Sequence, residues 1–543
     1  MANDELKTGE GPSDSESLEG ATIAAREAKL PFVLALDVGT SSVRAALYDS
    51  ACREVGGTAA RIERGFRTTP GGGAEMDAEE AIADVLRVID EVLVRAPAAG
   101  IEPRIEAVAV ACFWHSLVGL DRDGQPVTPV FGWADTRAAA DALALREQLD
   151  ESAAHGRTGC RFHPSYWPAK LLWLQKERAE VWRAATRWMS FAELLALRLC
   201  GESKASVSMA SGTGLFDLRS CDWDAPLLRE LKLDANQLPL IAGDGETLTL
   251  AARYGERWPQ LRRGCAFFPA VGDGAANNIG EGCASRSRAA LMIGTSAAMR
   301  VVYEGAAPSE LDESLWCYRV DRKRVVVGGA LSDGGGLYAW LTDALALSSR
   351  AATGEHERTT DSAEIERALD VSGPDSHGLT MLPFWAGERS TGWHTSARGA
   401  ILGLTMHTRP IEILRACMES IAYRCAVIAD ALEAHAPGMS LRASGGALRA
   451  SPAWARILAD ALGRPLALSR VREASSRGAV LLALEAMGAI KSVTEFPVEA
   501  GEVFEPDEAR HALYRKGLER QQRIYELLVN DSEVARLLSE AGE

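Results

Sequence analysis

The stretch LALDVGTSSVRAALY, residues 34–48, decides the fold, and a near copy, ALMIGTSAAMRVVY, follows at residues 290–303. Each stretch is an apolar run, then Gly-Thr-Ser, then a second apolar run that ends in tyrosine and an acid. This pattern predicts a buried strand, a tight turn and a second strand. A repeat about 250 residues long is too long for a solenoid and indicates two similar domains that face each other.

The two turns have the chemistry of a phosphate-binding site. Gly39 and Gly294 allow the backbone to turn tightly and to approach a ligand closely, and the threonine and serine that follow offer hydroxyls beside backbone N–H groups. Asp37 ends the first strand, where a carboxylate can hold Mg²⁺. The second copy has Ile293 before its glycine, so only one half carries the acid. This asymmetry predicts two hairpins that grip one nucleotide, with the metal on one side.

Composition and charge favour a soluble protein that acts on small ligands. The chain has 543 residues, of which 47% are apolar and 25% charged, a length that predicts two to four domains. Its net charge of −16 argues against nucleic acid and anionic membranes as partners. Ten cysteines without a C-x-x-C pair indicate reduced thiols. Since a signal peptide and a membrane-spanning apolar run are both missing from the sequence, we expect a cytoplasmic protein.

The first half of the chain alternates predicted strands and helices. Residues 1–30 are expected to form a solvated tail, and residues 31–284 an N-terminal domain. Residues 105–112 form a continuous apolar run typical of a strand buried on both faces. This strand delivers His115 and Ser116 to its carboxyl end, where open α/β sheets place ligands. Residues 130–137 add Trp133, Asp135 and Arg137 in one short loop, although a core histidine and a structural ion pair are the alternatives.

The second half repeats the alternation, as a predicted domain at 285–490 followed by a helical extension at 491–543. Near the end of the first predicted domain, Asp273 lies between Gly272 and Gly274, which suggests a carboxylate on a freely accessible backbone near the second turn. Residues 441–452 run from a strand into Gly445 and Gly446, where bare glycines let a flat base lie on the backbone. The last helices, clearest at 512–528, are expected to pack on the outside.

Taken together, these motifs resemble the FGGY carbohydrate kinases of the actin/hexokinase-like ATPase superfamily, from about Leu34 to Ile490. The resemblance rests on ordered motifs: the Asp37–Ser41 loop, Trp133–Arg137, Gly272–Gly274, Gly294–Ser296, Gly387–Arg389 with Ala397–Gly399, and Gly445–Ala447 with Ser451. It implies an α/β fold of two actin/hexokinase-like (RNase H-like) domains facing across an interdomain cleft. Details such as His115–Leu117 and Arg300 are similar to the gluconate kinase branch, whereas Trp114 stands where methionine is usual.

The resemblance also implies residue roles. The enzyme would use ATP and Mg²⁺ to phosphorylate an open-chain sugar acid, most simply D-gluconate. Asp273 would be the general base and Asp37 the metal ligand. The expected phosphate ligands are Thr40, Ser41, Gly294 and Thr295. The expected adenosine contacts are Gly445, Gly446, Ala447 and Ser451. The expected sugar contacts are His115, Ser116, Trp133, Asp135 and Arg137, with Arg137 and Arg300 as candidates to meet a substrate carboxylate.

Two other functions stay open at this point. One is a related kinase that acts on xylulose, ribulose, glycerol or another polyol. The other, of a different class, is a nucleotide-binding regulator or chaperone on the same scaffold, which the presence of Asp273 disfavours. P-loop kinases are excluded because the chain contains no Gly-Lys dipeptide. For the assembly, a homodimer stays open.

Overall fold

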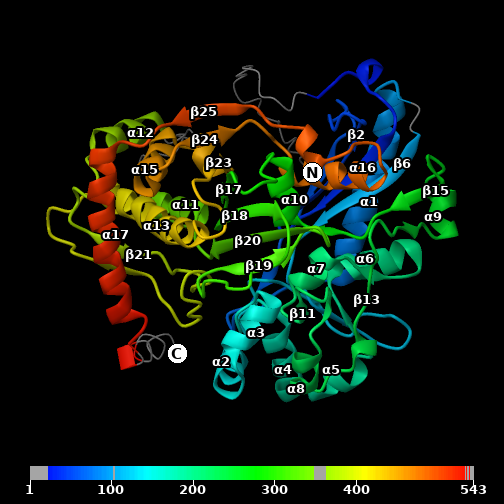
Figure 1. Cartoon of the computed structure of the whole chain (residues 1–543), viewed down its shortest axis with the longest axis horizontal. Helices are drawn as coiled ribbons and strands as arrows, with labels where there is room; N and C mark the ends of the chain where they lie inside the picture. The colour runs from blue at the N-terminus through cyan, green and yellow to red at the C-terminus, as the bar shows by residue number, and fades with distance from the viewer. Residues whose placement is uncertain are drawn as a thin grey trace, which may run out of the picture.

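The structure, a computed structural model, describes residues 22–101, 104–345, 347, 362–531, 533–534 and 537. Within them, two large mixed sheets lie side by side, and Figure 1 shows helices α10 and α16 between them. One buried apolar cluster centres on the N-terminal sheet and extends to Val302, Trp316 and Val326 of the C-terminal sheet, and a second centres on the C-terminal sheet. This arrangement confirms the predicted α/β class with two facing domains.

The N-terminal sheet is built around the first quoted stretch. Its strands, in spatial order, are β14 (Leu248–Thr249), β15 (Leu261–Phe267), β6 (Ile105–Cys112), β1 (Phe32–Val38), β2 (Ser42–Tyr48) and β3 (Ala60–Glu63), with β16 (Val271–Gly272) also paired to β6. Strands β1 and β2 form the predicted antiparallel hairpin, and β6 lies parallel to β1. Strand β6 is almost wholly buried, as expected for a strand with helices on both faces.

The C-terminal sheet repeats this topology around the second stretch. Its strands, in spatial order, are β19 (Trp316–Arg319), β20 (Arg324–Leu331), β18 (Ala297–Glu304), β17 (Arg288–Ile293), β23 (Ser440–Ser444), β24 (Leu466–Ser469) and β25 (Ala500–Phe504). The order β20-β18-β17-β23-β24 matches β3-β2-β1-β6-β15, with the same parallel and antiparallel pairings. The crossover helices correspond too: α1 (Ala78–Ala98) precedes β6, and α13 (Pro410–Leu432) precedes β23.

Smaller elements complete the two halves. A group of short helices and strands lies below the N-terminal sheet in Figure 1. Its helices are α2 (Ala139–Gln148), α3 (Glu151–Thr158), α4 (Trp167–Glu177), α5 (Ala179–Ala184), α6 (Phe191–Cys200), α7 (Val207–Ser211) and α8 (Ala225–Glu230), and α9 (Ala252–Arg257) follows it. The short strands are β4 (Arg67–Thr68), β5 (Ala74–Met76), β7 (Val118–Leu120), β8 (Val130–Phe131), β9 (Arg187–Met189), β10 (Lys204–Ala205), β11 (Phe216–Asp217), β12 (Asp222–Trp223) and β13 (Leu240–Ile241). The C-terminal half adds β21 (Thr380–Leu382), β22 (Ala400–Leu402), α11 (Gly335–Ala344), α12 (Ser362–Val371), α14 (Gly446–Ala450) and α15 (Pro452–Leu462).

Helices α10 (Asp273–Gly280) and α16 (Ala474–Ala486) cross in backbone contact at the junction of the two halves. A Cβ at Gly280 would lie 1.8 Å from the Ala474 carbonyl oxygen, and one at Gly478 would lie 1.8 Å from the Ala276 carbonyl oxygen. Glycine at both positions is therefore required for this close crossing. Although α16 comes late in the chain, it packs on β1 and β6 of the N-terminal sheet.

The two ends of the chain differ from expectation. Residues 1–21 of the predicted tail lie outside the described residues, but residues 22–30 are not a free tail, because Ile23 forms a β-bridge with Val55. The extension after residue 490 is not wholly helical. Its strand β25 pairs antiparallel with β24 at the edge of the C-terminal sheet, and helix α17 (Glu508–Leu528) follows.

All ten cysteines lie in the described ranges as free thiols, and all but Cys200 are buried. Among the described residues, we find no helix whose length and apolar character would let it span a bilayer.

Candidate active site

The two Gly-Thr-Ser turns differ in length. In the first hairpin Val38 pairs with Val43, and the Gly39 N–H donates to the Ser42 carbonyl at 3.0 Å. In the second, Ile293 pairs with Ala297, and the Gly294 N–H donates to the Ser296 carbonyl at 2.9 Å. The first turn is thus one residue longer than the second. Both present backbone N–H groups of the kind that bind phosphate oxygens.

Asp37 and Asp273 lie at the carboxyl ends of strands that flank β6. Asp37 on β1 pairs in register with Ala111, and Gly272 on β16 pairs with Cys112. Asp273 then begins α10, where the helix dipole favours a negative charge. The sheet therefore places both acids at the carboxyl ends of its strands, on either side of β6.

The glycines around Asp273 have a different reason from the predicted one. A Cβ at Gly272 would lie 1.8 Å from Trp114 Cε2, and one at Gly274 would lie 2.7 Å from Trp114 Cζ3 and 2.9 Å from Arg300 Nε. The backbone around Asp273 is not freely accessible, because an indole and a guanidinium pack directly on it. The Gly-Asp-Gly motif accommodates these side chains, and only the Asp273 side chain faces the cavity.

Burial raises the pKa values of both acids. Burial raises the pKa of Asp37 to about 7, and the nearby carboxylates of Asp273 and Glu473 act in the same direction, while Arg44 opposes them. Arg44 Nη1 lies 3.9 Å from Asp37 Oδ2 but 2.5 Å from Glu473 Oε2. Burial also raises the pKa of Asp273, opposed by Arg300 and by the Gly274 N–H. A divalent cation beside Asp37 would offset this concentration of negative charge, so the residues present fit a metal there.

A cavity of about 440 Å³ connects the two turns with Asp273. The predicted residues that line it are Thr40, Ser41, His115, Trp133, Asp273, Gly294 and Thr295. A larger cavity of about 850 Å³ lies against α17. We place the chemistry in the smaller one, because the described lining of the larger cavity includes neither Asp273 nor either turn.

Two arginines in the smaller cavity have partly unused donors. Arg300, on β18, is 8% exposed, and its Nε and Nη1 atoms find no hydrogen-bond partner within the described part of the chain. Burial lowers the pKa of Arg300 to about 10, so it stays charged at neutral pH. Arg389 packs over the Trp133 ring at 5.2 Å, and its Nε is likewise unpaired among described atoms. The sequence motif contains Arg389, but nothing local in it indicates that this guanidinium reaches the cavity.

The geometry of His115 fixes its tautomer. Its Nδ1 lies 2.5 Å from the Gly212 carbonyl oxygen, which can only accept, so Nδ1 carries the proton. Burial and the nearby Arg389 lower the pKa of His115 well below its usual value. The ring is therefore neutral, and Nε2 presents a lone pair that can accept a hydrogen bond from a ligand hydroxyl.

Three predicted sugar contacts lie outside the described lining of this cavity. Ser116 is fully buried, and its hydroxyl accepts from the Phe191 N–H at 3.1 Å. Arg137 donates to Asp135 at 2.5 Å and to Glu75 at 2.8 Å. The Asp135 carboxylate also accepts from the Ala74 N–H. Here the structural alternative, a satisfied ion pair, describes the loop better, because each charge already has its partner.

The predicted adenosine residues form part of a glycine-rich cradle beside the second turn. A Cβ at Gly445 would lie 2.1 Å from the Ile293 carbonyl oxygen, whereas no described atom lies within 4 Å of one at Gly446. Ala447 borders the cradle, since its Cβ would lie 2.9 Å from a Cβ at Gly335. Ser451 is instead buried, and its side chain accepts from Trp454 N as the cap of α15. Only Gly446 thus offers the bare surface expected for a base.

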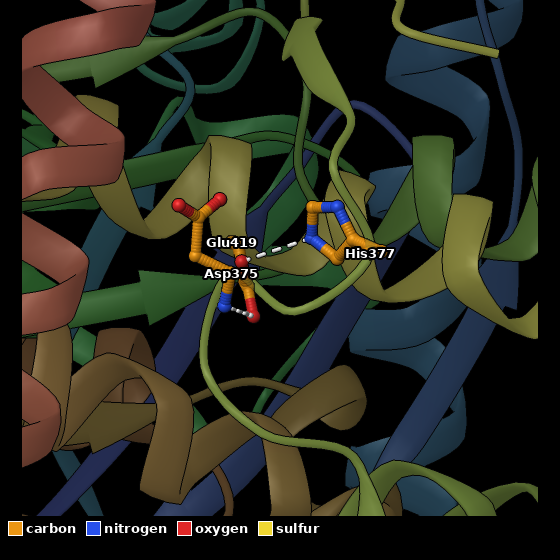
Figure 2. A group of neighbouring side chains, drawn as sticks. All are labelled: Asp375, His377 and Glu419. Carbon is orange, nitrogen blue, oxygen red and sulfur yellow. Dashed lines mark hydrogen bonds and ion pairs between the residues drawn. The ribbon is translucent and has the colours of Figure 1, made fainter.

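A separate group, Asp375, His377 and Glu419, has the composition of a metal site but is already neutralised. In Figure 2 the His377 ring faces Glu419, and one ligand atom from each of the three residues lies within 4.8 Å of the other two. Arg415 Nε donates to Glu419 at 2.7 Å, and Arg520 donates to both Asp375 oxygens. These arginines already supply the positive charge that a cation would bring, so we assign no metal here.

Comparison with known proteins agrees with this geometry. Residues 32–280 match the N-terminal domain, and residues 289–487 the C-terminal domain, of the FGGY family of carbohydrate kinases, and the chain belongs to that family. A gluconokinase of Bacillus subtilis (strain 168) is 28% identical over 470 residues, which cover 85% of this chain and 88% of the relative.

Solved structures show the same fold. A ligand-bound xylulose kinase from Lactobacillus acidophilus has a TM-score of 0.83 at 26% identity, covering 92% of this chain and 99% of that one. A gluconate kinase from the same organism has a TM-score of 0.81 at 26% identity, covering 92% and 98%. The predicted family is therefore confirmed.

Proposed function

We propose that the chain transfers the γ-phosphate of ATP to a hydroxyl of an open-chain sugar acid, with D-gluconate as the first candidate and 6-phospho-D-gluconate as its product. The observation that carries this proposal is the pair of arginines in the cavity of Asp273, the buried Arg300 and the partly buried Arg389, each with a donor that has no partner among the described residues. A buried guanidinium with unused donors is costly unless an anion compensates it. A substrate carboxylate supplies such an anion, whereas a neutral ketose or glycerol does not.

In this proposal Asp273 is the general base. Its ionised carboxylate accepts the proton of the acceptor hydroxyl while the oxygen forms a bond to the γ-phosphorus and the bond to the β-phosphate bridge breaks, so the products are a phosphate ester and ADP. The backbone N–H groups around Thr40, Ser41 and Gly294 would hold phosphate oxygens from opposite sides. Asp37 would hold Mg²⁺, which supplies neutralising charge on the phosphates when bound.

The remaining groups orient the acceptor. His115 Nε2 would accept a hydrogen bond from one sugar hydroxyl, and Trp133 would form a flat apolar wall beneath Arg389. Closure of the two halves over the cavity would exclude water as a competing acceptor. A ketose such as xylulose is the second candidate, because the xylulose kinase of Lactobacillus acidophilus is as similar in fold as the gluconate kinase.

A substrate screen separates these candidates. Initial rates of ADP release would be measured with gluconate, xylulose, ribulose and glycerol, and gluconate should give the highest kcat/KM. In Arg300→Met the gluconate KM should rise on the order of 100-fold, as for loss of a charged hydrogen-bond partner. Arg137→Met is the matched comparison, because its donors are already used by Asp135 and Glu75.

Two outcomes would change the assignment. A preference for xylulose that persists in Arg300→Met would replace the sugar acid by a ketose. A loss of kcat in Arg300→Met with an unchanged acceptor KM would move Arg300 from the substrate carboxylate to the transferred phosphoryl group.

A further inference from the structure

The loop that carries Arg389 is folded around a buried carboxylate. Glu388 is 2% exposed, and its oxygens accept backbone N–H groups from Gly392 at 3.0 Å, Thr391 at 3.3 Å and His394 at 3.3 Å. The loop thus turns back on the side chain of one of its own residues. Because these three hydrogen bonds connect the carboxylate to the backbone of the loop, we expect a shift of the carboxylate to shift the neighbouring Arg389 as well.

The C-terminal helix reaches this carboxylate. The Tyr525 hydroxyl, on α17, donates to Glu388 Oε2 at 2.7 Å. The tyrosine fits against the loop so closely that a Cβ at Gly392 would lie 1.8 Å from its hydroxyl oxygen. Arg424 covers the other side, with its guanidinium carbon 4.6 Å from the centre of the Tyr525 ring and Nη2 3.7 Å from Glu388 Oε1.

The opposite side of the loop is anchored to the C-terminal sheet. The Ser390 N–H donates to the Ala330 carbonyl at 2.9 Å, and the Ala330 N–H donates to Ser390 Oγ at 3.1 Å. Arg389 therefore lies between two fixed points, Glu388 on one side and Ser390 on the other. From there its guanidinium extends into the cavity that contains Asp273 and Arg300.

We propose that Tyr525 is a positioning residue that holds Arg389 for acceptor binding, acting through Glu388. Helix α17 lies beyond residue 487, where the match to the family ends, so an element outside the matched domains takes part in the site. The proposal rests on the proposed function in one respect: Arg389 contacts the acceptor. The rest of α17 attaches independently, through Tyr514, Arg520 and Gln521.

The test compares two tyrosines of the same helix. Tyr525→Phe removes only the hydroxyl that donates to Glu388. Tyr514→Phe removes a hydroxyl that lies away from the cavity and accepts a hydrogen bond of 3.0 Å from Arg415 Nη2. Both side chains are buried, so both variants should lower the unfolding temperature similarly. Only Tyr525→Phe should raise the acceptor KM, on the order of tenfold, with the KM for ATP unchanged.

A double-mutant cycle with Arg389→Lys keeps the proposal falsifiable where stability changes. If Tyr525 acts through Arg389, Tyr525→Phe should add little to the acceptor KM of Arg389→Lys. Equal kinetic effects of Tyr525→Phe and Tyr514→Phe, or fully additive effects in the cycle, would overturn the positioning role. The measurements use whichever acceptor the wild-type enzyme phosphorylates, so failure of gluconate as a substrate is seen first and separately.

Discussion

The two Gly-Thr-Ser hairpins share a sequence pattern and a place in their sheets, yet their charged side chains stand at different cross-strand pairs. In the first, Asp37 faces Arg44 across the hairpin; in the second, Met292 occupies the place of Asp37 and faces Ala298. The first hairpin therefore has an acid beside its turn, whereas the second has an apolar side chain there and contributes the charged Arg300, which pairs with Ala290 and lines the cavity. In the proposed function, the N-terminal half supplies the base and the metal ligand, and the C-terminal half supplies Arg300, Arg389 and the glycine cradle.

The largest expected effect comes from the N-terminal half, which contributes Asp273 to the cavity. Asp273→Asn should lower kcat on the order of 10²- to 10⁴-fold, the range for loss of a general base. ATP binding, measured by calorimetry, should persist because the second hairpin and the glycine cradle are untouched. Asp123→Asn, at an exposed turn, controls for the chemical change alone. An active Asp273→Asn enzyme would contradict the base assignment.

A pH effect should accompany the base. Burial raises the pKa of Asp273, and the carboxylate must be ionised to accept a proton. We therefore expect kcat to fall as the pH drops through a value above the ordinary range of aspartate. An acidic limb of the pH–rate profile within that ordinary range would argue against Asp273 as the buried base.

Asp37 allows a comparison of stability between the hairpins. The pKa of Asp37 is about 7 in the folded protein and 3.8 ordinarily, so the metal-free fold loses stability as the pH rises from about 4 to about 7. The loss is at most about 4 kcal/mol. Asp37→Asn should then raise the unfolding temperature of metal-free protein at pH 8 but not at pH 4, and Mg²⁺ should stabilise only the wild type. Met292→Leu should change neither result.

The smallest expected effect concerns the turn hydroxyls. Thr40→Val and Thr295→Val should each raise the KM for ATP only a few-fold, since a neutral hydrogen bond contributes about 1 kcal/mol and the backbone donors remain. Side-by-side kinetics of the two variants would show which turn holds the phosphates more through its side chain. An effect of 100-fold in either variant would show that the hydroxyl, rather than the backbone, is the main ligand.

Local sequence pattern predicted the features that depend on local structure. The paired hairpins, the buried β6 and the placement of Asp273 at a strand end follow from apolar runs and glycines, which act over a few residues. The same reasoning left the Asp135–Arg137 loop open between a sugar contact and a structural ion pair, because the second partner of Arg137, Glu75, lies 62 positions before it. No pattern within the loop shows that Glu75 completes the ion pair.

Contacts between distant segments explain the other differences. Trp114 explains why Gly272 and Gly274 flank Asp273, and Tyr525 explains why the loop of Arg389 contains Gly392. In each case a side chain far away in sequence occupies the space that a Cβ would need. A glycine in the sequence can mark ligand access or a close neighbour, and only the three-dimensional structure distinguishes the two.

The bare crossing of α10 and α16 has a consequence for how substrates enter. With only backbone between Gly280 and Gly478, neither helix can slide without steric overlap, so we expect the halves to swing about this point as about a pivot. Atoms near a pivot travel least. Asp273, at the start of α10, would remain almost stationary while the rim of the C-terminal half sweeps over it, so the enzyme would carry its phosphate donor to a fixed base.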